Sequence, residues 1–136
     1  MDKKATEYFK QGYSCSESMI KAAIDEGLVP KELLPVATSF SGGMGSGCLC
    51  GAVAGAQIII GAVHGKDDNE RTGIKARELA KKFIEEFKNK NKFTCCKALT
   101  AGLDMSSPER KQNCARLVND CATIVKTILE LNKQTV

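Results

Sequence analysis

Cysteine is the residue type that gives this sequence its chemistry. Seven cysteines occur in 136 residues: Cys15, Cys48, Cys50, Cys95, Cys96, Cys114 and Cys121. A cysteine thiolate can attack other sulfur atoms or bind soft metals. In a chain expected to be cytoplasmic, so many thiols favour metal binding or redox chemistry over structural disulfides. Because the count is odd, at least one thiol stays unpaired in any intramolecular disulfide scheme.

The spacing of the cysteines excludes the common local motifs. No C-x-x-C pair is present, so the sequence lacks zinc-finger, bacterial ferredoxin and thioredoxin-like spacing. C-x-x-C-H, which attaches haem covalently, is absent as well. A shared site would therefore have to gather thiols from distant segments, as metal sites in helical bundles do.

Several cysteines fall where helices are expected to begin. Cys15 lies inside the capping box "SCSE", Cys48 and Cys50 follow a glycine-rich loop, and Cys95 and Cys96 follow Thr94. A helix N-terminus stabilises a thiolate. Each of these cysteines alone could equally be a small packing residue, but thiols at three helix starts favour a functional role.

The last two cysteines share the apolar stripe of the expected C-terminal helix. Cys121 is predicted to be a core residue. Cys114, in the second turn and nearer the end of the helix, is more open to a functional role. The only histidine, His64, is expected at the surface at a helix end and gives little support to a Cys-His catalytic pair.

The stretch "SGGMGSGCLCGAVAGA", residues 41–56, is not a nucleotide-binding loop. A P-loop needs a lysine and a hydroxyl residue after its last glycine, but Cys48 and Leu49 follow Gly47, and the glycine spacing is not a dinucleotide fingerprint. Gly51 and Gly55 lie four residues apart and so permit a neighbouring backbone to approach one helical face. The glycines are expected to let the chain fold back so that a helix start presents a thiol inside the domain.

The elements that must position these thiols are helices. Apolar residues recur with the helical period and β-branched residues never alternate with polar ones, which predicts an all-α fold. We expect a single cysteine-rich domain over residues 1–136, a bundle of about five to six helices around a central Gly/Ala-rich helix. The expected helices cover residues 3–10, 14–26, a short segment after Pro30, 48–63, 67–88, a short turn from Thr94, and 107–132.

Composition narrows the partners and the location. The net charge is +4 and no basic block is interleaved with aromatic residues, so nucleic-acid binding is not expected. The N-terminus lacks an apolar signal core, and the longest apolar run, residues 48–63, is too short and too weakly hydrophobic to span a bilayer. We therefore expect a cytoplasmic protein without membrane association. The oligomeric state is left open.

The cysteine layout resembles a family of redox-active proteins named for the pattern C…GCAxxG…C…C. The similar segments run over most of the chain: "GYSCSESM", "SGGMGSGCLCGAVAGA", "HGKDD", "FTCCKAL" and "NCARLV". Carried over position by position, the resemblance assigns the family thiols to Cys15, Cys50, Cys96 and Cys114, with Cys48 as the substitute for Cys50. The order of "CGAVAG" departs from the pattern in the family name, in which glycine precedes cysteine.

Three hypotheses about function follow. The first is an iron–sulfur cluster on Cys15, Cys50, Cys96 and Cys114 that transfers electrons to a redox partner protein, with zinc as the alternative metal. The second is a metal-free thiol–disulfide oxidoreductase or sensor, in which Cys15 attacks and Cys50 or Cys114 is its partner. The third is a helical interaction module with structural cysteines. Whether the protein is an enzyme is left open.

Overall fold

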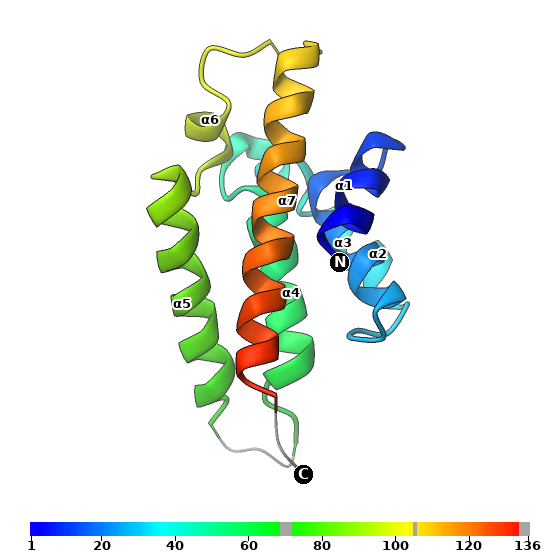
Figure 1. Ribbon diagram of the computed structural model, residues 1–136, viewed down its shortest axis with the longest axis vertical. Helices are drawn as coiled ribbons and strands as arrows, with labels where there is room; N and C mark the ends of the chain where they lie inside the picture. The colour runs from blue at the N-terminus through cyan, green and yellow to red at the C-terminus, as the bar shows by residue number, and fades with distance from the viewer. Residues whose placement is uncertain (69–71, 105, 134–136) are drawn as a thin grey trace.

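The computed structural model is all-helical, and it describes residues 1–68, 72–104 and 106–133. Within those ranges, α5 and α7 run along the length of the molecule beside α4, while α1, α2 and α3 pack on the opposite side from α5 (Figure 1). The predicted fold class is confirmed. The elements in chain order are α1 (Asp2–Lys10), α2 (Cys15–Asp25), α3 (Leu33–Thr38), the irregular glycine turn η1 (Gly43–Gly47), α4 (Gly51–His64), α5 (Ile74–Asn91), α6 (Cys96–Leu99) and α7 (Pro108–Leu131).

Two helix starts that matter for the cysteines form as the sequence predicts. The Ser14 side chain accepts a hydrogen bond from the Glu17 amide, and the Glu17 carboxylate accepts one from the Ser14 amide. This capping box fixes the first turn of α2. At α7, the Ser107 hydroxyl accepts from the Arg110 amide, and Pro108 takes the first helical position. Cys15 and Cys114 are thereby carried on well-anchored helix starts.

The Gly/Ala-rich helix α4 contacts α2, α5 and α7, as expected for a central element. Gly51 and Gly55 explain how closely α2 approaches it. A Cβ atom at Gly55 would lie 2.7 Å from the Met19 Cβ, and one at Gly51 would lie 3.3 Å from the Cys15 Cβ. The predicted close approach along this glycine face is confirmed, and it brings the first residue of α2 to the start of α4.

Helix α4 begins later than the sequence indicated. The expected start was residue 48, but the chain from Cys48 to Cys50 is extended, and Leu49 forms an antiparallel bridge with Cys95. The Cys50 amide donates to the Thr94 carbonyl oxygen at 2.7 Å, and the Cys96 amide donates to the Cys48 carbonyl oxygen. These inter-segment bonds replace the helical ones, so Cys50 becomes the N-cap and the helix starts at Gly51.

The region between α4 and α5 also differs from expectation. Helix α5 begins at Ile74 after Gly73, whose φ of +62° suits glycine, rather than near Asp67. The Glu70 half of the expected capping box lies outside the described residues. His64 was expected at the surface, but only 9% of it is exposed, and burial together with the charge of Lys75 lowers its pKa.

The core lies between α2, α4, α5 and α7, with Ala5 of α1 packed into it. Its largest fully buried side chains include Phe83, Phe87 and Ile59, and Cys121 joins them with none of its surface exposed. Cys121 is therefore a core residue, as predicted. Along the described ranges, no helix is both long enough and apolar enough to cross a membrane.

Candidate functional site

Four cysteines from four elements lie near one another at one end of the bundle. Cys15 is the first residue of α2, Cys50 caps α4, Cys96 is the first residue of α6, and Cys114 lies in the second turn of α7. The Cys15 thiol interacts through space with those of Cys50, Cys96 and Cys114, and the Cys50 thiol interacts with those of Cys96 and Cys114. Sulfur atoms separated by up to a hundred residues are thus neighbours in the folded chain.

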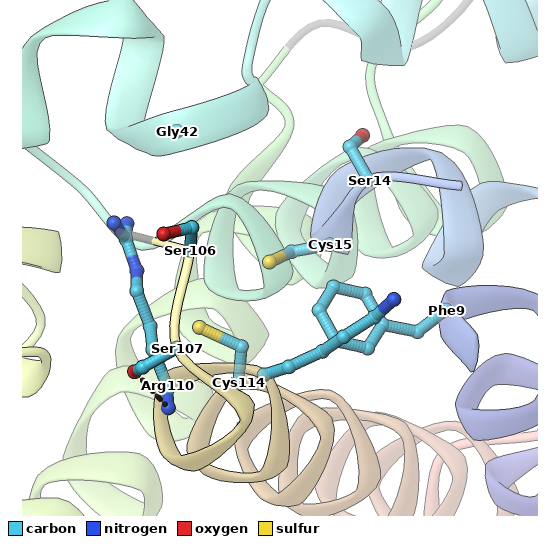
Figure 2. Close-up of a pocket in the computed structure, with 9 residues that line it drawn as sticks. Phe9, Ser14, Cys15, Gly42, Ser106, Ser107, Arg110 and Cys114 are labelled. Atoms are coloured by element: carbon cyan, nitrogen blue, oxygen red, sulfur yellow. Dashed lines mark hydrogen bonds between the residues drawn. The ribbon is translucent and has the colours of Figure 1, made fainter. Parts of the chain in front are cut away.

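The closest relationship is between Cys15 and Cys114. Each side chain shifts the pKa of the other, and their sulfur atoms face one another across the gap between α2 and α7 (Figure 2). Cys15 is partly exposed and Cys114 is 9% exposed. Two thiols that shift each other's pKa in this way share one proton and form the candidate pair for a disulfide.

The Cys114 thiol is acidic. Its pKa is lowered from 9.0 to about 6, chiefly by the hydrogen bond from Cys15, with a hydrogen bond from Arg110 and the charge of that guanidinium acting in the same direction. Burial opposes these effects. At neutral pH, Cys114 is therefore largely a thiolate, which is the form that attacks sulfur and binds metals.

The Cys15 thiol behaves in the opposite way. The hydrogen bond to Cys114 raises its pKa well above 9.0, and burial and the nearby cysteines Cys50, Cys114 and Cys96 add to the shift. Cys15 therefore stays protonated, and its S–H group is the donor that favours the thiolate form of Cys114. Because the two groups titrate together, a single shared negative charge describes the pair best.

Arg110 is the functional residue that the sequence analysis missed. Its guanidinium favours the thiolate forms of both Cys96 and Cys114, and so acts on two of the four thiols. A signal was present, because residues four apart on a helix share a face and Arg110 precedes Cys114 by four. A guanidinium stays charged at any physiological pH, so Arg110 is a permanent cation beside the thiolate.

The other two cysteines of the group are less reactive as they stand. Burial raises the pKa of Cys50, although the amides of Val53 and Ala52 partly offset it. Burial also raises the pKa of Cys96, against the charge of Arg110. The bridge between residues 48–50 and 94–96 holds both thiols in place.

A tight glycine contact supports the position of Cys96. Gly43 has a φ of +63°, and a Cβ atom there would lie 2.8 Å from the Cys96 Cβ and 2.6 Å from the Cys48 amide nitrogen. Only glycine fits both the backbone conformation and the space. The glycine loop thus folds against the second pair of thiols, in accord with the prediction that it lets the chain turn back on itself.

The remaining cysteines lie outside this group. Cys48 and Cys95 are exposed on the bridge itself, where the Cys95 thiol donates to the Gly47 carbonyl oxygen at 3.2 Å. Cys121 interacts with Cys50 but is enclosed in the core, and burial raises its pKa well above 9.0. All seven cysteines are free thiols.

The four clustered thiols are of a type that can bind a metal ion or an iron–sulfur cluster. Cys15, Cys50, Cys96 and Cys114 provide four sulfur donors, the number that an iron–sulfur cluster requires. Across the described ranges, however, no three or more His, Cys, Asp or Glu side chains gather closely enough to hold a metal ion. The donor chemistry therefore suits a cluster, whereas the arrangement itself is that of a facing thiol pair with two more thiols nearby.

A pocket opens beside the thiol pair. It has a volume of about 440 Å³ and is lined by Phe9, Ser14, Cys15, Gly42, Ser106, Ser107, Arg110, Lys111 and Cys114. Figure 2 shows the Cys15 and Cys114 sulfur atoms and the Arg110 side chain around this space. A molecule entering the pocket can therefore reach the acidic thiol.

Comparison with known proteins places the chain in a family. The sequence pattern described as "Putative redox-active protein (C_GCAxxG_C_C)" matches residues 13–128. No curated protein and no solved structure matched the chain. Since the match spans most of the sequence and includes the four clustered cysteines, the chain belongs to the C_GCAxxG_C_C family of redox-active, cysteine-rich proteins.

Proposed function

We propose that this protein is a thiol–disulfide redox protein in which Cys114 attacks and Cys15 resolves. The observation that carries the proposal is the placement of these two side chains, with their sulfur atoms facing one another, at the edge of an open pocket (Figure 2). Arg110 supports it by favouring the thiolate form of Cys114. The two cysteines come from distant segments, so they would act as an attacking and resolving pair without the C-x-x-C spacing.

The first step is a thiol–disulfide exchange. The Cys114 thiolate attacks one sulfur atom of a substrate disulfide, a new sulfur–sulfur bond forms between Cys114 and that sulfur, and the second substrate sulfur leaves as a thiolate. Arg110, beside the reacting sulfur, stabilises negative charge in the transition state. The product is a mixed disulfide on Cys114.

The second step follows from the loss of charge on Cys114. The largest cause of the raised pKa of Cys15 is its hydrogen bond to that thiolate, and this interaction disappears once Cys114 is in a mixed disulfide. Cys15 then releases its proton to solvent and attacks the Cys114 sulfur. A Cys15–Cys114 disulfide forms and the second substrate thiolate leaves. In total, the protein loses two electrons and the one proton of Cys15, and the substrate disulfide is reduced to two thiolates.

These roles revise the assignment made from sequence. There, Cys15 was the expected attacker because it lies at a helix start. The pKa directions favour Cys114 instead, because Cys15 serves as the donor that stabilises its partner. Cys114 was already one of the two partners named for Cys15.

The test is a trapping experiment with the reduced protein. Cys15→Ser keeps a hydroxyl donor but cannot resolve, so addition of a disulfide should accumulate a mixed disulfide on Cys114, detected by mass spectrometry of the intact and digested protein. Cys48→Ser, at an exposed thiol outside the pair, should behave like the wild type. If Cys15→Ser releases substrate thiol in the wild-type amount and traps nothing, the assigned roles are wrong.

A second candidate function rests on a separate observation, the convergence of four thiols. We infer that an iron–sulfur cluster, if bound, would be held by Cys15, Cys50, Cys96 and Cys114. It would supply one-electron transfer to a redox partner protein. Arg110 would then lie next to two of the ligands and raise the reduction potential by favouring added negative charge.

Anaerobic purification separates the two candidates. Iron and acid-labile sulfide in equal amounts, with visible absorption that is lost when any one of the four cysteines is changed to Ser, would support the cluster. A colourless protein without iron that still cycles between dithiol and disulfide would support thiol exchange. Replacement of Cys121 is the control, because it leaves all four proposed ligands in place.

A further inference from the structure

The pocket beside the thiol pair carries a positive charge. Among the described residues that line it, Arg110 and Lys111 are cationic and none is acidic. Arg110 lowers the pKa values of two of the thiols. Lys111 is exposed, and no ion pair holds its ammonium group within the part of the chain that the structure describes. The ammonium group is therefore available to a ligand.

The same cationic surface continues into a neighbouring hollow. This second hollow has a volume of about 330 Å³ and is lined by Phe9, Lys10, Pro108, Lys111, Gln112 and Ala115, again without an acidic residue among those described. Phe9 and Lys111 line both spaces. The two hollows thus adjoin across a shared apolar and cationic wall, and only the first contains the thiols.

The helix starts beside the first pocket, and not its hydroxyl groups, also favour an anion. The Ser107 hydroxyl is occupied, since it accepts from the Arg110 amide and donates to the Asp104 carbonyl oxygen. The pocket lies at the N-terminal turns of α2 and α7, where the helix dipoles favour negative charge. Arg110, Lys111 and the two helix starts therefore act in the same direction.

We propose that the substrate is a low-molecular-weight disulfide whose two halves carry carboxylates. One half lies in the pocket with its sulfur against Cys114, and the other extends past Phe9 towards Lys10, with Lys111 between them. The volumes are those of small-molecule sites, which run from roughly 300 to 1,000 Å³. The proposal rests on the thiol-exchange function above. Cys114 forms the bond to one substrate sulfur, the other leaves as a thiolate, and attack by Cys15 releases the remaining half.

The test compares disulfides that differ in charge. Glutathione disulfide is anionic, 2-hydroxyethyl disulfide is neutral and cystamine is cationic. The rate at which each oxidises the reduced protein is measured in a single turnover and divided by its rate with a free small thiol, which removes differences in intrinsic reactivity. We expect the corrected rates to fall from the anionic to the neutral to the cationic disulfide, and the difference to shrink as salt is added.

Two lysine variants on the same helix sharpen the comparison. Lys111→Gln should slow the anionic disulfide about fivefold, as expected for the loss of one nearby charge in water, while leaving the neutral disulfide unaffected. Lys126→Gln is the matched control, since Lys126 lies on α7 but lines neither hollow. It should change none of the rates.

The outcomes distinguish the two levels of the proposal. If all three disulfides oxidise the protein at similar corrected rates, or Lys111→Gln slows them equally, the substrate class is wrong while thiol exchange stands. If none of them oxidises Cys114, thiol exchange itself is wrong, and the substrate proposal falls with it.

Discussion

Cys114 and Cys121 lie on one apolar stripe of α7, two helical turns apart, yet their thiols are opposites. The pKa of Cys114 is lowered to about 6, whereas burial raises that of Cys121 well above 9.0. Cys114 faces Cys15, Arg110 and an open pocket, while Cys121 is enclosed in the core. The helix that carries them is the same, so the neighbours contributed by other elements decide which thiol is reactive.

This contrast divides the bundle into two regions. At one end, α2, α4, α6 and α7 bring their first turns together and leave polar groups beside the sulfur atoms. In the middle, α4, α5 and α7 pack through apolar side chains such as Phe83 and Phe87, and a cysteine there behaves as a small hydrophobe. The predictions below test whether the two regions are as separate as this comparison implies.

The largest effect should be seen in alkylation of the wild-type reduced protein at pH 6. Cys114 should react at least about tenfold faster than a thiol of ordinary pKa, because its larger thiolate fraction outweighs the lower nucleophilicity of an acidic thiol. Cys121 should react only after unfolding. Digestion and mass spectrometry at several times give the rate for each cysteine. Comparable alkylation rates of Cys114 and Cys121 in the native protein would contradict the difference in reactivity between the two thiols.

The second effect concerns the glycine contact behind Cys96. Gly43→Ala should lower the free energy of unfolding by about 2–3 kcal/mol, because the new Cβ meets Cys96 and Cys48 in a backbone conformation that disfavours alanine. Gly27→Ala is the matched control. It has a similar φ of +73°, but nothing lies within 4 Å of the added Cβ, so only the backbone cost of about 1 kcal/mol should appear. Urea unfolding of both variants provides the measurement. Equal decreases in the free energy of unfolding would show that the contact with Cys96 and Cys48 does not contribute to stability.

The third effect sharpens the account of Cys114. Cys15→Ala removes the main hydrogen-bond donor, so the pH midpoint for Cys114 alkylation should rise from about 6 towards 9.0. Arg110→Gln should move it in the same direction by a smaller amount, because the arginine effects are second to that of Cys15. Cys15→Ser keeps a donor and should shift the midpoint least. A midpoint unchanged in Cys15→Ala would mean that the pair does not share a proton.

Local sequence patterns predicted the parts of this structure that depend on local physics. The capping box at Ser14 and the serine–proline start of α7 formed as expected, since caps are satisfied within one turn. The glycine pair on α4 predicted a close helix contact, which α2 makes. Cys121 was predicted to be buried because it continues an apolar stripe.

The features that were missed depend on segments far apart in the chain. Residues 48–50 looked like a helix start, but pairing with residues 94–96 made them extended. The acidity of Cys114 comes chiefly from Cys15, ninety-nine residues away in sequence, and the effect of Arg110 on Cys96 depends on the same long-range packing. No local rule indicates which of seven sulfur atoms will face each other.

The most direct test of the central claim is to map the disulfide that forms when the reduced protein is oxidised by one equivalent of a small disulfide. After unreacted thiols are blocked and the chain is digested, mass spectrometry should find the peptides of Cys15 and Cys114 linked, with Cys121 blocked only after denaturation. A bond between other cysteines, or no bond although the oxidant is consumed, would contradict the account.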